Sequence, residues 1–312
     1  MTHPKTSRRD LLLGAGALAV AATAPALRAA DRERTTAPRI GIALGAGGAG
    51  GLAHISMLEV LDDLGLRPHR IAGSSIGAVI GALYPSGMSA ADIRKLVRRD
   101  FSANGSNTLE RLVSEQALTW MNLVEVELGN GGLLDSETVL SHFYRSIATR
   151  SFEDLELPLL VVAADLWSRE QVVLDRGSVE RAVRASMALP GVFQPVTVDG
   201  RVLIDGGTVN PVPWDLLDDC DYVIAVDVSG VRTRPEEEAP GYFEVLFNSA
   251  KVMQQAIVEA RREHQPPDLF LAPEIRDVRS LEFYRADEVF AMAEASRNRL
   301  RRELEARLEL RG

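Results

Sequence analysis

Short apolar segments with the composition of β-strands alternate along the chain with segments that have the apolar spacing of amphipathic helices. In residues 52–64, Ile55, Leu58 and Leu61 recur every three residues, and Gly65 follows in the place of a helix C-cap. Strands are expected at 39–44, 70–72, 159–164, 171–174, 222–228 and 269–271, a hairpin at 196–204, and helices at 52–64, 76–84, 179–187, 243–262 and from 285 onward. This alternation predicts an α/β fold whose largely parallel sheet is covered by helices on both faces.

The composition indicates one folded domain in the body of the chain. Of the 312 residues, 46% are apolar, which is enough to bury a core, and no linker rich in Pro, Gly or Ser divides them. The single cysteine, Cys220, excludes a disulfide within the chain and a cysteine-based zinc cluster. The formal net charge is -9, although four of the basic residues lie in the first 30 positions, so the body is acidic. We therefore do not expect nucleic acid as a partner.

The N-terminus has the three parts of an export signal. Residues 1–9 are polar and basic, residues 11–24 are apolar and uncharged, and small residues follow. The pair Arg8-Arg9 resembles a twin-arginine signal, in which Leu11 replaces the usual Phe. We expect a signal peptide at 1–30, a short linker at 31–38, a domain at 39–312, and export to the bacterial periplasm. The alternative is an uncleaved inner-membrane anchor, but residues 11–24 are shorter than the roughly 20 residues that a spanning helix needs.

A glycine-rich loop follows the first predicted strand. Gly45, Gly47 and Gly50 satisfy the pattern G-x-G-x-x-G, which is typical of a dinucleotide-binding loop. Such a site also needs a carboxylate near the end of the next strand, and the segment 71–74 contains none. The same loop can present backbone N–H groups to a developing oxyanion at a helix N-terminus. An oxyanion hole is therefore the favoured interpretation, and a purely structural tight turn is the alternative.

A second motif lies between the next strand and helix. Residues 73–77 match G-x-S-x-G, which is the pattern of a nucleophile elbow when a strand precedes it and a helix follows. This context predicts Ser75 as a nucleophile, exposed above the N-terminus of the helix, whose dipole favours negative charge. The simpler alternative is that Ser74 or Ser75 caps the helix.

A nucleophilic serine needs a base. A triad in the order Ser, Asp or Glu, His would require His264, whose charged and polar neighbours predict an exposed helix end. His54 is expected to pack or cap beside the glycine loop. Asp205 follows a predicted strand and precedes Gly206-Gly207, which keep its carboxylate accessible. A carboxylate can act as the base in a dry site with a short hydrogen bond. Its alternative role is that of a turn residue.

Three motifs in this order resemble the patatin-like phospholipases, over about residues 39–300. They are the glycine loop at 46–51, the G-x-S-x-G at 73–77 and the D-G-G at 205–207, and segments such as 182–193 are also similar to the family. The resemblance implies a three-layer α/β/α sandwich, a Ser75–Asp205 dyad, and an oxyanion hole formed by the N–H groups of Gly47, Gly48 and Ala49. It also implies no metal or cofactor. The supporting motif residues are Gly45, Gly50, Gly51, Gly73, Gly77, Gly206 and Gly207.

The resemblance implies a serine acyl hydrolase of lipid carboxyl esters, acting on a phospholipid, lysophospholipid or glyceride. The family usually has Arg or Lys where this chain has Gly50, and Gly where it has Ala46. The backbone donors survive both changes, but a positive charge beside the loop is lost at Gly50, so we expect a preference for neutral esters over anionic phospholipids. Residues 112–128 could line an acyl groove or form a lid in peripheral contact with a membrane, but ordinary core packing beneath a loop is the favoured interpretation of their pattern. Two other functions stay open: a catalytically silent lipid-binding module and an esterase with a Ser-Asp-His triad. The sequence does not predict an oligomeric state.

Overall fold

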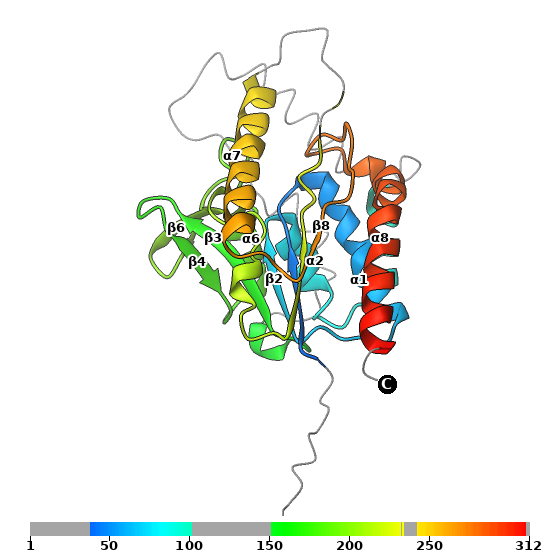
Figure 1. The fold of residues 1–312 in the computed structure, drawn as a ribbon. Helices are drawn as coiled ribbons and strands as arrows, with labels where there is room; N and C mark the ends of the chain where they lie inside the picture. Colours follow the sequence, from blue (N-terminus) through cyan, green and yellow to red (C-terminus); the bar gives the residue numbers. More distant parts are fainter. Residues whose placement is uncertain (1–37, 102–150, 232, 234–241, 310–312) are drawn as a thin grey trace, which may run out of the picture. The chain divides into compact units, whose positions relative to one another are not determined.

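The computed structural model describes residues 38–101, 151–231, 233 and 242–309. Within them, strands form one sheet in the order β5-β6-β3-β2-β1-β7-β8, and β4 pairs with β3 outside this path (Figure 1). The strands are β1 (Ile40–Leu44), β2 (Arg70–Ser74), β3 (Leu159–Asp165), β4 (Gln171–Leu174), β5 (Val196–Val198), β6 (Arg201–Asp205), β7 (Tyr222–Val226) and β8 (Leu269–Leu271).

The sheet is parallel at its centre and antiparallel on one side. The pairs β1–β2, β1–β7, β2–β3 and β7–β8 are parallel. The pairs β3–β4, β3–β6 and β5–β6 are antiparallel. The expected α/β fold with a largely parallel sheet is therefore confirmed, and the β5–β6 hairpin lies where its Asp-Gly turn predicts it.

The described helices also follow the predicted positions, with one addition. They are α1 (Ala53–Asp63), α2 (Ile76–Leu83), α3 (Ala90–Phe101), α6 (Val179–Ser186), α7 (Tyr242–His264) and α8 (Ala286–Glu309), with short 3-10 helices η1 (Gly48–Leu52), η2 (Phe152–Asp154), η3 (Gly206–Thr208), η4 (Trp214–Leu216) and η5 (Phe283–Arg285). Among these described α-helices, only α3 lies outside the predicted ranges. The end of α1 agrees with its prediction, because Gly65 has φ 65° and Leu66 N–H donates to the Leu61 carbonyl at 2.8 Å.

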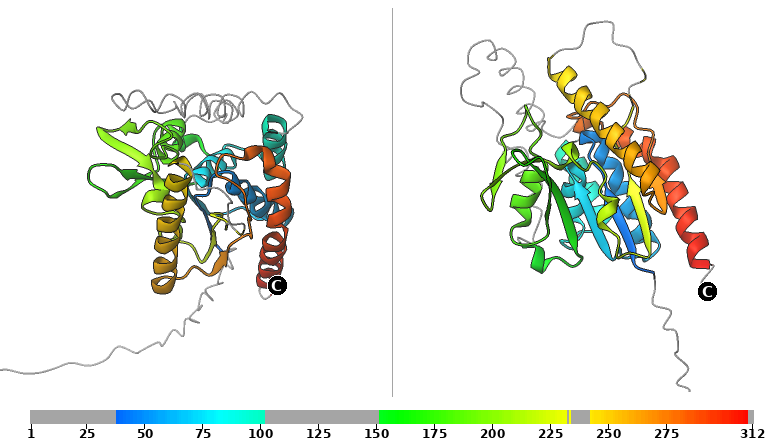
Figure 2. Two further views of the ribbon diagram at one scale, coloured as in Figure 1. Left: turned by 90° about the horizontal axis from the view of Figure 1, so that it is seen from above. Right: turned by 60° about the vertical axis from the view of Figure 1, so that its left-hand side comes forward.

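Helices cover both faces of the sheet, which gives the expected three layers (Figure 2). Strand β1 shows why, because Ile42 and Leu44 project into the main core with α1, α2, α3 and α8, whereas Ala43 projects toward the other face. There it packs with Val258 of α7 and Trp214 of η4. The small side chains of the central strands on this second face allow α7 and η4 to approach the sheet closely.

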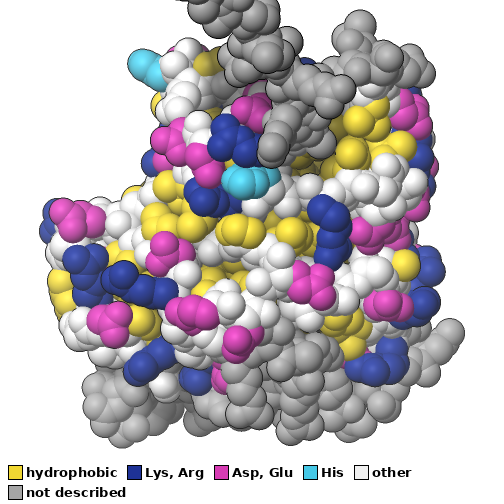
Figure 3. Space-filling model, turned by 90° about the horizontal axis from the view of Figure 1, so that it is seen from below, with side chains coloured by type: hydrophobic (Ala, Val, Ile, Leu, Met, Phe, Trp, Pro, Cys, Tyr) yellow, Lys and Arg dark blue, Asp and Glu magenta, His cyan; other side chains and the backbone are white. Residues whose placement is uncertain are grey.

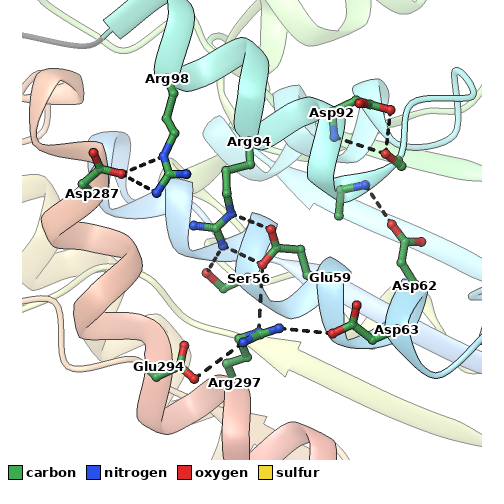
Figure 4. Close-up of polar contacts among 12 residues, drawn as sticks. Ser56, Glu59, Asp62, Asp63, Asp92, Arg94, Arg98, Asp287, Glu294 and Arg297 are labelled. Carbon is green, nitrogen blue, oxygen red and sulfur yellow. Dashed lines mark hydrogen bonds and ion pairs between the residues drawn. The ribbon is translucent and has the colours of Figure 1, made fainter. Parts of the chain in front are cut away.

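Ion pairs join three helices of the main layer (Figure 4). Arg94 of α3 donates to both carboxylate oxygens of Glu59 of α1, at 2.5 and 2.6 Å, and its guanidinium lies 3.8 Å from the centre of the Phe290 ring of α8. Arg297 of α8 binds Asp63 of α1 at 3.1 Å. These contacts tie α8, far along the chain, to the first helix.

The two ends of the sheet differ in character. Figure 3 shows the end at which the parallel strands begin, where charged side chains of both signs surround exposed hydrophobic ones. A cavity of about 330 Å³ at the start of β2 and β3 is lined by Arg70, Asp175 and apolar side chains that include Phe152 and Leu157. The motif residues lie at the opposite ends of these strands, so this cavity is separate from the candidate site.

Candidate active site

The strand arrangement brings Ser75 and Asp205 together from positions 130 residues apart. Strand β4 pairs along one edge of β3. Along the other edge, β2 pairs in parallel as far as Val162, and β6 pairs antiparallel with residues 163–165. The carboxyl ends of β2 and β6 therefore meet head to head. Asp205 is the last residue of β6, Ser75 follows the last residue of β2, and Ser75 Oγ donates a hydrogen bond of 2.6 Å to Asp205 Oδ2.

Ser75 has the backbone geometry of a sharp elbow. Its φ of 54° and ψ of -124° lie in a region that side-chain-bearing residues rarely adopt. Its side chain makes no capping hydrogen bond to α2, so helix capping does not account for it. The turn also requires glycine at position 77, because a Cβ there would lie 2.0 Å from the Leu44 carbonyl oxygen. The conformation is thus held by close packing of the elbow against β1.

Asp205 is a buried carboxylate with an unusual proton affinity. The side chain is 2% exposed, and its Oδ1 accepts the Gly207 N–H at 2.7 Å. Burial raises its pKa to about 6, and the hydrogen bonds from Ser75 and Gly207 oppose part of that rise. At neutral pH it is therefore ionised, yet it accepts a proton more readily than an exposed Asp does. Such a carboxylate can act as a general base.

The end of α6 holds both members of the pair. Ser186 Oγ accepts the backbone N–H of Ser75 at 2.9 Å, and Met187 Sδ lies 3.6 Å from Ser75 Oγ. The next residue, Ala188, accepts the backbone N–H of Asp205 through its carbonyl at 3.0 Å. The segment 186–188 thus fixes the nucleophile and the base to one rigid helix end. Sequence reasoning noted residues 182–193 only as similar to the family and missed this role.

The glycine loop packs against the end of β7 and Val228 on one side and against Ser280 on another. Gly45 N–H donates to the Val226 carbonyl at 3.0 Å, and Ala46 N–H donates to the Pro211 carbonyl at 2.8 Å. Ala49 N–H donates to the Ser280 carbonyl at 2.8 Å, so this group is not available to an oxyanion in the structure. This corrects the expected set of three donors. Gly47 is the residue before η1 and Gly48 is its first residue, and their N–H groups donate to no backbone carbonyl of a described residue.

His54 supports this loop from α1. The residue is fully buried, and its Nε2–H donates to the Gly45 carbonyl at 2.8 Å, which accords with the expected packing role. Burial lowers its pKa to about 4, although the bond to Gly45 acts in the opposite direction. His54 is therefore neutral at physiological pH and fixes the first turn of the loop.

The remaining predicted residues are placed as follows. His264 is exposed at the end of α7, and its Nδ1 lies 2.8 Å from the Ala260 carbonyl oxygen, so the structure does not bring it to Ser75. Of the supporting glycines, Gly45 lies before η1, Gly50 and Gly51 within it, Gly73 in β2, Gly77 in α2, and Gly206 and Gly207 in η3. Residues 112–128 and the signal at 1–30 lie outside the described residues.

Steric crowding explains why position 50 holds glycine and not a basic residue. A Cβ at Gly50 would lie 2.6 Å from the Val228 carbonyl oxygen, so the loop has no room for a side chain there. The loop is thus adapted to glycine at this position.

Among the described residues, no group of His, Cys, Asp and Glu side chains is arranged to hold a metal ion.

Comparison with known proteins places this geometry in a family. An uncharacterised NTE-family protein of Mycobacterium tuberculosis is 34% identical over 217 residues, which cover 69% of this chain and 56% of that protein. Human patatin-like phospholipase domain-containing protein 6 is 34% identical over 201 residues, 62% of this chain and 14% of that protein. The chain thus spans about half the length of its mycobacterial relative.

Among solved structures, VipD from Legionella pneumophila matches with a TM-score of 0.43 and 14% identity, over 82% of this chain and 66% of that chain. The family model described as "Patatin-like phospholipase" matches residues 42–218, which include the glycine loop, Ser75 and Asp205. The chain belongs to the patatin-like phospholipase family.

Proposed function

We propose that the protein is a serine acyl hydrolase that cleaves lipid carboxyl esters with Ser75 as nucleophile and Asp205 as general base. One observation carries the proposal: a serine in a strained elbow donates a hydrogen bond of 2.6 Å to a buried carboxylate whose pKa is raised to about 6. The burial that raises the proton affinity of Asp205 also excludes water, which strengthens this hydrogen bond.

The reaction has two steps. In the first, Ser75 Oγ attacks the ester carbonyl carbon while Asp205 takes its proton, and the N–H groups of Gly47 and Gly48 stabilise the tetrahedral oxyanion. Collapse of this intermediate breaks the bond to the alcohol, which leaves with the proton from Asp205. In the second step, water gives a proton to Asp205 and attacks the acyl carbon of the acyl-enzyme. The bond between this carbon and Ser75 Oγ then breaks, Oγ takes the proton back from Asp205, and the carboxylic acid is released.

The substrate class rests on the family. A phospholipid, a lysophospholipid or a glyceride would each supply the carboxyl ester, and no metal or cofactor is needed for this chemistry. The loss of a basic side chain at Gly50 favours neutral esters over anionic phospholipids, because no fixed positive charge remains at that place in the loop.

Labelling with a fluorophosphonate tests the mechanism, because the reagent phosphonylates an activated serine. Intact mass should show one adduct on the wild-type protein, none on Ser75→Ala, and slow formation on Asp205→Asn. A His264→Ala variant is the control for a Ser-Asp-His triad and should label at the wild-type rate. A folded wild-type protein without an adduct would contradict the proposal and favour a catalytically silent lipid-binding module.

We also propose that residues 1–30 direct export through the twin-arginine pathway to the periplasm. The support is the sequence pattern around Arg8-Arg9. None of the described helices is long and apolar enough to cross a membrane. Replacing both arginines with lysine in a bacterial host should retain the protein in the cytoplasm. Normal export of that variant would refute the pathway, and recovery of the uncleaved chain in the inner membrane would support the anchor instead.

A further inference from the structure

One buried polar side chain near the dyad has no part in the mechanism above. One side of helix α7 carries four residues at intervals of four, of which Val258 packs with the core of the sheet's second face: Leu246, Ala250, Gln254 and Val258. All are apolar except Gln254, which is only 8% exposed. A polar residue at such a position is costly unless its amide finds a partner.

Gln254 lies beside the loop that carries the general base. A Cβ built on Gly207 would be 2.6 Å from Gln254 Nε2 and 3.0 Å from Asp205 Oδ1, so both groups flank the same point. The amide makes no hydrogen bond to any described residue, and its atoms are not sealed from solvent. The buried stem therefore holds an amide with free hydrogen-bonding capacity next to Asp205.

The chemistry decides which part of a substrate this amide would meet. Asp205 must return the proton of Ser75 to the departing alcohol, so the alcohol oxygen has to lie within hydrogen-bond reach of its carboxyl group. The alcohol half of the ester, rather than the acyl chain, is thus the part that passes beside the loop at 205–207. An uncharged amide offers one donor group and one acceptor, which match those of a hydroxyl group.

Resting on the function proposed above, we propose that Gln254 is a specificity residue that hydrogen-bonds a hydroxyl group on the alcohol half of the ester. A site built to hydrogen-bond a substrate hydroxyl discriminates strongly against analogues without it, because the protein group is then left unpaired. The enzyme should accordingly favour esters of polyols over esters of simple alcohols with the same acyl chain.

The test compares two esters of one acid, 1-monodecanoylglycerol and ethyl decanoate, in wild type and Gln254→Met. Methionine keeps the length and helix propensity of glutamine but removes the amide. In Gln254→Met we expect kcat/KM to fall about tenfold on the monoacylglycerol, which corresponds to the loss of one hydrogen bond. On the ethyl ester the fall should be less than about twofold, because that ester has no hydroxyl group to lose. Gln255→Met is the matched control, because Gln255 is exposed and binds Glu259 at 2.8 Å.

Fluorophosphonate labelling, which involves no alcohol half of this kind, separates the possible failures. Suppose that wild type and Gln254→Met label at equal rates. If the variant then loses the same activity on both esters, or loses activity on neither ester, the inference about Gln254 is wrong, but the proposed hydrolase function is not affected. If the wild-type protein neither labels nor cleaves either ester, the proposed function fails and the inference fails with it. A second variant, Gln254→Asn, retains an amide on a shorter stem and should lose less of the preference than Gln254→Met.

Discussion

At the scale of single residues, Ser186 provides the clearest prediction. Its Oγ accepts the N–H of Ser75, and removing it leaves that buried donor unpaired in a residue with a strained backbone. We expect Ser186→Ala to lower kcat about tenfold with little change in KM, because the nucleophile is misplaced while substrate contacts remain. Stopped-flow ester hydrolysis measures both constants.

Ser178, at the other end of the same helix, supplies the control for that experiment. Its hydroxyl caps α6 by accepting the Arg181 N–H, so Ser178→Ala should cost about 1 kcal/mol of stability and leave the labelling rate of Ser75 intact. If the two variants lose stability and kcat in the same proportion, Ser186 has only a structural role.

Sequence motifs identified the residues that the structure joins in a hydrogen bond, but not those that hold them. Ser75 and Asp205 stand in recognisable local patterns, each beside glycines that the turn requires. Ser186 contacts Ser75 across 111 residues, and no local pattern encodes that contact. The same reason explains the error at Ala49, whose N–H donates to Ser280, a residue in a distant loop.

At the scale of elements, most helices and strands could be predicted because their apolar residues keep a regular spacing. The sequence of α3 also contains a helical pattern, although no helix is predicted there. Its buried residues recur at helical intervals among charged ones: Ala90, Ile93, Leu96 and Val97. Strand direction is different. Nothing in residues 171–174 or 201–205 indicates that β4 and β6 run antiparallel to β3, because direction depends on the connections and the packing around them.

The ion pair between α1 and α3 leads to a prediction about how these elements are joined. Glu59 and Arg94 are 16% and 17% exposed, and Glu59→Gln would leave the Arg94 guanidinium without its charged partner (Figure 4). Because the remaining charge is largely buried, we expect a loss of about 2 kcal/mol in the free energy of unfolding, measured by urea denaturation. The exposed pair Lys95–Asp92 is the control, since Lys95→Ala should change stability by less than about 0.5 kcal/mol. Equal losses in both variants would show that burial does not strengthen the Glu59 pair.

At the scale of the whole molecule, the site depends on topology. Strands β2 and β6 lie end to end along one edge of β3, and this brings Ser75 and Asp205 together. The arrangement requires β6 to run in the direction opposite to β2. A sequence can supply both strands without revealing that they share an edge. The resemblance to a family predicts that Ser75 and Asp205 form a dyad, whereas the local motifs alone predict a nucleophile and a base without placing them together.

The same fold buries two titratable groups whose effects on stability have opposite signs. Asp205 has a pKa of about 6 in the folded state against 3.8 in the unfolded state, so the folded state binds the extra proton and its stability falls as pH rises through this window. His54 has a pKa of about 4 against 6.5, so the unfolded state binds the extra proton and stability rises over nearly the same window. Each contribution is on the order of 3 kcal/mol, since one pKa unit corresponds to about 1.4 kcal/mol.

These two contributions nearly cancel in the wild-type protein, and single variants should separate them. Relative to wild type, Asp205→Asn should gain on the order of 3 kcal/mol in unfolding free energy between about pH 4 and pH 7, because only the His54 contribution remains. His54→Gln, which keeps a donor for the Gly45 carbonyl, should lose a similar amount over the same range. Chemical denaturation at matched pH values measures both differences, and the double variant should again follow the wild-type pH dependence. Parallel curves for all four proteins would mean that neither group titrates abnormally in the folded state.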